Sequence, residues 1–160
     1  YRSRLVAKEI KTNKREDLFA ATPPLEAKKL LMSMATTEGI GYCRNGMEEN
    51  LKLDFIDIRR AFFYAPARRV VFVDLPPEDF EEGMCGKLVK AVYGTRDAPQ
   101  NWEYEYRGFM ENLGFKTGRA TPCAFYHEPR NIRCAVHGDD FTVLGYDDQL
   151  NWLRKEIEEI

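Results

Sequence analysis

Apolar and polar positions recur along this chain with two different periods, which predict strands and helices in alternation. Runs of strand length with β-branched and aromatic residues lie at residues 5–10, 53–58, 70–73, 88–93, 124–127, 132–136 and 141–144. Apolar residues at helical spacing lie at residues 22–37, 98–113 and 148–159. The mixture of both kinds of element predicts an α+β fold.

Residues with known turn and cap preferences set the expected helix ends. Thr22, Pro23 and Pro24 precede the first helix, Gly114 ends the second, and Asp147 or Asp148 is expected to cap the third. The leucines and methionines of the first helix are expected to face the core, and residues 39–50 are expected to form a loop.

Two adjacent aspartates, Asp139 and Asp140, lie between the strands predicted at 132–136 and 141–144. Side by side, two carboxylates repel each other unless something positive lies opposite them. Mg²⁺ is a natural candidate because it binds one or two carboxylates together with substrate phosphates. An ordinary turn containing aspartate is the alternative.

A third acid follows another apolar run at residues 53–58. Asp57 lies near the end of this predicted strand, where sheets commonly present chemical groups, whereas Asp54 lies within the run. A solvated or salt-bridged role is expected for Asp54, so Asp57 is the preferred partner of the acidic hairpin.

Four motifs in this order resemble the reverse transcriptase domain of copia-type LTR retrotransposon polyproteins. Residues 57–62 resemble its Asp-Val-Lys-Ser-Ala-Phe element, and residues 92–102 resemble its Leu-Tyr-Gly-Leu-Lys-Gln-Ala-Pro-Arg-x-Trp element. Residues 136–141 stand where the family carries Tyr-Val-Asp-Asp, and residues 2–8 are similar to Lys-Ala-Arg-Leu-Val-Ala-Lys. The resemblance extends from the first residues to about Gly145.

The chain departs from the family pattern at four positions. His137 and Gly138 replace the Tyr-Val before the acid pair, Thr95 replaces a leucine, and Asp97 replaces a glutamine. Gly138 makes the approach to the hairpin tip more flexible. Asp97 is expected to add negative charge where template or nucleotide would lie.

The resemblance implies a polymerase palm with a split βαβ, ferredoxin-like core, together with part of the fingers. Residues 1–50 correspond to the fingers-like segment and residues 51–160 to the palm, without the thumb and the RNase H region. The chain starts without methionine and stops inside a predicted helix. We therefore expect a piece of a longer reading frame, inactive in isolation.

The resemblance also implies two-metal phosphoryl transfer, in which a primer 3′-hydroxyl attacks the α-phosphate of a deoxynucleoside triphosphate. Asp57 and Asp139 would be the main ligands of two Mg²⁺ ions, or Mn²⁺, with Asp140 a weaker third ligand. Phe62 matches the aromatic position that lies under the sugar and excludes ribonucleotides, although a core role is the alternative.

Five further positions are implied to bind substrate. They are Gly94, Ala98 and Pro99, under the templating base pair, and Arg4 and Lys8, in contact with phosphate. Arg4 and Lys8 are four residues apart and would share one face of the predicted N-terminal strand.

The formal net charge is −2, which by itself argues weakly against a nucleic-acid partner. The first 16 residues nevertheless carry six basic and two acidic side chains. The partners implied by the family are an RNA or DNA template with its primer, deoxynucleoside triphosphates, and the integrase and RNase H parts of a Pol polyprotein. No run long enough to span a bilayer and no signal-like start are present, so we expect an intracellular protein, either cytoplasmic in a virus-like particle or nuclear.

Two other functions compete with the polymerase. Cys123, His127, Cys134 and His137 could in principle close a tetrahedral zinc site, although their spacing is not that of a common zinc motif. A catalytically inactive retroelement remnant that keeps the fold is the other alternative, favoured by His137, Gly138 and Asp97.

Overall fold

The computed structural model describes residues 6–10, 18–44, 46 and 49–159. The chain divides into two compact units that interleave in sequence. Unit 1 comprises Tyr1–Ala20 and Arg60–Glu105, and unit 2 comprises Ala21–Arg59 and Tyr106–Ile160. Each unit is therefore assembled from two separate stretches of the chain.

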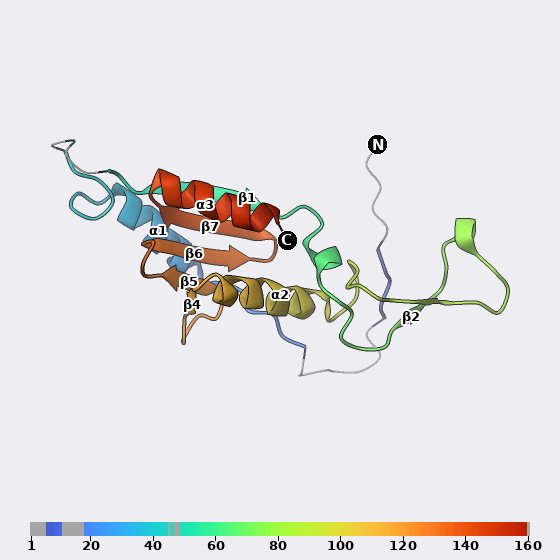
Figure 1. The fold of residues 1–160 in the computed structure, drawn as a ribbon. Helices are drawn as coiled ribbons and strands as arrows, with labels where there is room; N and C mark the ends of the chain where they lie inside the picture. Colours follow the sequence, from blue (N-terminus) through green and yellow to red (C-terminus); the bar gives the residue numbers. More distant parts are fainter. Residues whose placement is uncertain (1–5, 11–17, 45, 47–48, 160) are drawn as a thin grey trace. The chain divides into compact units, whose positions relative to one another are not determined.

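Unit 2 is built on a five-stranded antiparallel sheet with the order β1-β7-β6-β5-β4 (Figure 1). Its strands are β1 (Lys52–Asp57), β4 (Lys116–Thr117), β5 (Ala124–His127), β6 (Ile132–His137) and β7 (Asp140–Gly145). Both β1 and β6 pair antiparallel with β7, so β1 and β6 run parallel on either side of it. Antiparallel strands mixed with helices confirm the α+β fold class expected from the sequence.

Helices cover both faces of this sheet (Figure 1). α1 (Leu25–Thr36) packs on the face that carries Leu53 and Leu144, where Leu31 is buried. α3 (Asp147–Glu158) lies along β1 and β7 and buries Leu150, Leu153 and Ile157. The helical spacing of these three residues explains why one stripe of α3 is apolar.

Unit 1 contains short elements. They are the 3₁₀ helices η1 (Ala61–Tyr64) and η2 (Pro77–Asp79), the two-stranded ribbon of β2 (Phe72–Val73) and β3 (Gly86–Lys87), and the first part of α2 (Ala98–Asn112). Proline cannot donate to a strand ladder, so Pro76 and Pro77 prevent β2 from continuing. α2 ends in unit 2, where the Tyr106 ring meets Phe125 and Phe141 edge-on.

Some expected elements differ in the structure. The strand predicted at 88–93 does not form. Residues 88–91 instead make separate backbone hydrogen bonds with residues 65–71 and an isolated bridge between Pro66 and Lys90, and Val89 is 82% exposed. Residues 6–10 form no strand. Tyr146 occupies the N-cap of α3, and Asp147 and Asp148 are its first residues.

The apolar side chains of α1 face the core only in part. In α1 the methionine and leucine side chains are not all in the core, since Leu30 is 59% and Met32 is 44% exposed, while Met34 packs against the core.

Across the described parts of the chain, no helix combines the length and the apolar character needed to cross a membrane.

Candidate metal centre

Three carboxylates meet at one end of the sheet of unit 2. Asp57 is the last residue of β1, and Asp140, the first residue of β7, is its partner across the strands. Asp139 lies in the two-residue turn between β6 and β7. One oxygen from each of the three side chains lies within 4.8 Å of the other two. The structure thus brings together the three acids selected from the sequence.

The backbone around the turn explains why the acids converge. Gly138 adopts a φ of 65°, a left-handed conformation that suits glycine and lets the chain reverse in two residues. The N–H of Ile58 donates to the carbonyl oxygen of Asp139 at 3.0 Å. This hydrogen bond extends the β1–β7 ladder past its last pair and ties the turn to the end of β1.

The three acids form a concentration of negative charge. Asp57 and Asp140 are exposed and Asp139 is partly exposed. Like charges directly opposite each other on adjacent strands destabilise a sheet. Within the described residues, no lysine or arginine forms an ion pair with any of the three. Three carboxylates that are not paired with a described lysine or arginine offer the oxygen ligands that a hard divalent cation such as Mg²⁺ prefers.

Asp54, the rival of Asp57, has a different role. Its carboxylate lies on the opposite face of β1 and is 8% exposed. Arg154 of α3 donates to it twice, from Nε to Oδ2 and from Nη2 to Oδ1, each at 2.7 Å. Both oxygens of Asp54 are engaged in this bidentate pair, so the salt-bridged role expected for Asp54 is confirmed.

The other residues implied by the resemblance belong to unit 1, where described. Phe62 is partly buried, Ala98 is fully buried, and Pro99 and Lys8 are exposed. Gly94 has a φ of 95°, and a Cβ at this position would lie 1.8 Å from the carbonyl oxygen of Ala7. Arg4 lies outside the described residues.

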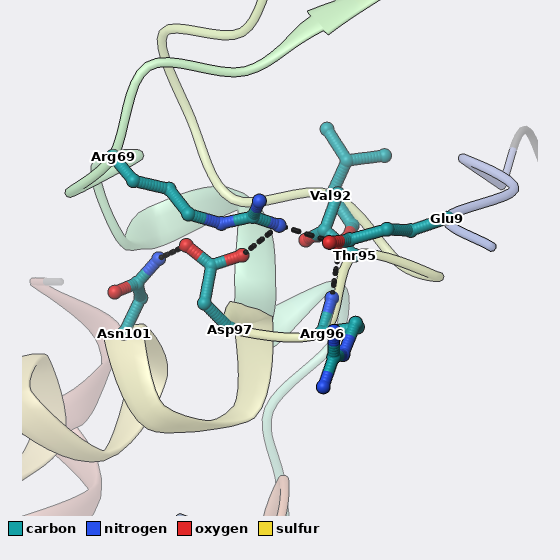
Figure 2. Close-up of polar contacts among 7 residues, drawn as sticks. All are labelled: Glu9, Arg69, Val92, Thr95, Arg96, Asp97 and Asn101. Carbon is teal, nitrogen blue, oxygen red and sulfur yellow. Dashed lines mark hydrogen bonds and ion pairs between the residues drawn. The ribbon is translucent and has the colours of Figure 1, made fainter. Parts of the chain in front are cut away.

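A network of charged groups that the sequence did not reveal surrounds Asp97 (Figure 2). Arg69 forms an ion pair with Asp97 at 3.0 Å and with Glu9 at 2.5 Å. Asn101 donates its side-chain N–H to Asp97 at 3.0 Å, and the backbone N–H of Arg96 donates to Glu9 at 2.7 Å. The network joins residues that are far apart in the sequence, so no local motif could indicate it.

This network compensates the charge of Asp97. Burial by itself would raise the pKa of Asp97, but hydrogen bonds from Arg69 and Asn101, with the charge of Arg69, lower it below its ordinary value. Glu9 has a lowered pKa as well: burial opposes the shift, while the hydrogen bonds from Arg96 and Arg69 cause it. Asp97 is 5% exposed. The negative charge expected to face a nucleic acid is instead paired within unit 1.

The zinc alternative is wrong for the described residues. His127 uses both ring nitrogens: Nε2 lies 3.1 Å from the carbonyl oxygen of Leu113, and Nδ1 accepts from the N–H of Arg130 at 3.2 Å. Cys123 and Cys134 are buried, and His137 is exposed. Among the described histidines, cysteines and acids, only the three aspartates of the hairpin end lie at metal-ligand spacing.

Comparisons with known proteins extend over almost the whole chain. Residues 1–159 match the profile of the family described as "Reverse transcriptase (RNA-dependent DNA polymerase)". The retrovirus-related Pol polyprotein from transposon TNT 1-94 of Nicotiana tabacum is 23% identical over an alignment of 160 residues, and the alignment covers 94% of this chain and 11% of that protein.

Two proteins of Arabidopsis thaliana are similar over a shorter stretch. The retrovirus-related Pol polyproteins from transposons RE1 and RE2 are each 28% identical over 101 residues, covering 59% of this chain and 7% of each protein. No solved structure matches. The chain spans about a tenth or less of the length of these relatives.

Proposed function

The chain belongs to the reverse transcriptase (RNA-dependent DNA polymerase) family, and we propose that it supplies the metal-binding centre of an RNA-directed DNA polymerase. The family membership confirms the resemblance that the four sequence motifs indicated. The observation that carries the proposal is the convergence of Asp57, Asp139 and Asp140 within 4.8 Å of one another. In this family context, such a group of acids serves nucleotidyl transfer.

We assign unit 2 to the palm of the polymerase. Its strands β1 and β6 run parallel with β7 between them, and α2 lies in the connection that joins them along the chain. We assign this arrangement to a split βαβ unit with a ferredoxin-like core, and the parallel course of β1 and β6 supports the assignment. Unit 1, which contains residues 6–10, is assigned to the fingers. On this assignment the palm would consist of two stretches of the chain, whereas the sequence led us to expect a single span from residue 51 onward.

In the proposed reaction, a primer 3′-hydroxyl displaces pyrophosphate from a deoxynucleoside triphosphate. When bound, two Mg²⁺ ions, or Mn²⁺, would stabilise the charge that develops on the phosphate oxygens. Asp57, at the end of β1, and Asp139, in the β6–β7 turn, would be the main ligands of the ions, and Asp140 would add a weaker carboxylate. The hydrogen bond from Ile58 to Asp139 keeps the turn in place for this purpose.

Residues of unit 1 would contact the nucleic acid and the nucleotide. We assign Phe62 to the sugar, Gly94, Ala98 and Pro99 to the support of the templating pair, and Lys8 and Arg4 to phosphate. Template, primer, and the integrase and RNase H parts of a Pol polyprotein are the proposed partners.

Primer extension tests the proposal on a polymerase that includes this chain together with its downstream region. Asp57→Asn and Asp139→Asn should each reduce extension on the order of 10³-fold, because each removes several kcal/mol of charge stabilisation. Asp148→Asn, an exposed acid of the same unit, is the matched control and should extend like the wild type. Wild-type extension by Asp57→Asn would refute the proposed role of the acids.

A non-catalytic remnant is the second candidate, favoured by the replacement of Tyr-Val with His137 and Gly138 before the acid pair. Such a protein would bind Mg²⁺ at the three acids without extending a primer. His137→Tyr should then recover extension, with Gly138 kept because its φ of 65° disfavours valine. Extension by the natural sequence excludes the remnant.

A further inference from the structure

Two phenylalanine side chains of unit 1 lie against the ring of Tyr93. The ring of Phe62 lies 4.5 Å from the ring of Tyr93, centroid to centroid, with an angle of 40° between their planes. The ring of Phe63 meets Tyr93 edge-on at 5.8 Å. Contacts of this kind hold rings in preferred orientations and contribute about 0.5–1.5 kcal/mol beyond the burial of apolar area.

The backbone holds Phe62 close to the segment that carries Tyr93. η1 is closed by hydrogen bonds from the N–H of Phe63 to Arg60 and from the N–H of Ala65 to Phe62. The N–H of Ala91 donates to the carbonyl oxygen of Ala65 at 2.8 Å, and Ala65 is fully buried. The end of this turn is thereby tied to a residue only two positions before Tyr93.

Tyr93 itself sits on a backbone with little freedom. Its carbonyl oxygen accepts a hydrogen bond from the N–H of Ala7 at 2.8 Å. Gly94 follows with a φ of 95°, and the space that a Cβ would need there is filled by the carbonyl of Ala7. The backbone of Tyr93 is therefore held by contacts that do not involve Phe62.

We propose that Tyr93 is a positioning residue for sugar selection: its ring fixes the orientation of Phe62 and so sets the discrimination against ribonucleoside triphosphates. This inference rests on the proposed function, in which Phe62 contacts the sugar. Phe62 is partly exposed, so one side of its ring packs on Tyr93 while the remainder offers surface to a ligand. The 2′-hydroxyl would be rejected by steric overlap with the Phe62 ring, so rejection depends on the position of this ring. A Phe62 ring that could change rotamer would admit the larger sugar.

The test measures kcat/KM for a deoxynucleoside triphosphate and for its ribonucleotide counterpart, again on the polymerase that includes the downstream region. Tyr93→Ala should lower the ratio of the two values about 3- to 10-fold, the equivalent of one lost ring contact. Tyr93→Leu, which keeps bulk without a flat ring, should lower it as well. Tyr93→Phe should preserve the ratio. Tyr64→Ala, on the same turn and 44% exposed, is the matched control and should also preserve it.

The outcomes separate this inference from the function on which it rests. Relaxed discrimination in Phe62→Val with wild-type discrimination in Tyr93→Ala and Tyr93→Leu would overturn the role of Tyr93 alone. Unchanged discrimination in Phe62→Val, with extension still abolished by Asp139→Asn, would remove the sugar role of Phe62 and this inference with it while leaving the polymerase. Wild-type primer extension by Asp57→Asn and by Asp139→Asn would overturn the proposed function itself.

Discussion

Burial and charge pairing act in opposite directions on the carboxyl group of Asp97. Burial disfavours the charged form, yet Arg69 and Asn101 stabilise it enough to lower the pKa. The same guanidinium also binds Glu9, so Arg69 is shared between two acids, and its own pKa is raised, chiefly by the hydrogen bond to Asp97. A replacement that adds an acid to the family motif is thus accommodated by a partner 28 positions earlier in the chain.

The network around Asp97 predicts a dependence of stability on pH. Because the pKa of Asp97 is lower in the folded state than its ordinary 3.8, its contribution is full above that value and is lost as the pH falls through the folded-state pKa. Asp97→Asn should cost about 1–2 kcal/mol in the free energy of unfolding near neutral pH. This cost should begin to shrink as the pH falls below the ordinary pKa of 3.8, where the unfolded chain takes up a proton, and should vanish once the pH has passed the lowered folded-state pKa.

Chemical denaturation at a series of pH values measures the difference between the two proteins. Asp74→Asn, an exposed acid of the same unit, is the control and should change stability little at any pH. A difference for Asp97→Asn that stays constant down to pH 2 would show that the ion pair with Arg69 does not stabilise the fold.

At the scale of the elements, two turns contain a glycine with positive φ, and the space around the two glycines differs. Gly138, in the β6–β7 turn, has a φ of 65° and open space where a Cβ would lie. Gly94, ahead of α2, has a φ of 95° and a backbone carbonyl 1.8 Å from that position. The first turn requires glycine for its backbone conformation alone, and the second requires it for space as well.

Alanine substitutions should therefore have unequal effects. Gly138→Ala should cost about 1–2 kcal/mol, the strain of a left-handed non-glycine residue. Gly94→Ala should cost considerably more, because residues 6–10 would have to move away from the loop. Denaturant midpoints with unchanged m-values measure both costs. Equal losses of stability would show that Ala7 does not pack on Gly94 in solution.

At the scale of the whole molecule, each unit draws on two distant stretches of the chain. The three acids proposed to bind metal lie in unit 2, where Asp57 comes from the first stretch and Asp139 and Asp140 come from the second. A cation bound by all three would link those stretches. Metal binding at these acids would accordingly be coupled to the stability of unit 2.

Mg²⁺ should raise the thermal unfolding temperature of the protein. A ligand that binds only the folded state adds about 2.7 kcal/mol at 100 times its Kd. Circular dichroism melts with Mg²⁺ and after addition of EDTA measure the shift. Asp139→Asn should lose most of it, whereas Asp148→Asn should retain it. A shift of the same size in Asp139→Asn would place Mg²⁺ elsewhere on the protein.

The sequence by itself determined the elements whose signals are local. The hairpin bearing Asp139 and Asp140, and the helix that begins at Ala98, follow from periodicity and from glycine and proline placed at their ends. The choice of Asp57 over Asp54 also followed from position within a strand. The ordered motifs were sufficient to indicate the family, because they preserve residue types at fixed spacing.

Only the tertiary structure decided which distant groups meet. The pairing of β1 with β7, the bidentate contact of Arg154 with Asp54 and the sharing of Arg69 by Glu9 and Asp97 join residues 60 to 100 positions apart in most cases. A strand pattern repeats every two residues and reports which face is apolar, but it does not specify the partner strand. Partner choice depends on the packing of the complete sheet and its helices, and the interleaved units of this chain follow from that packing.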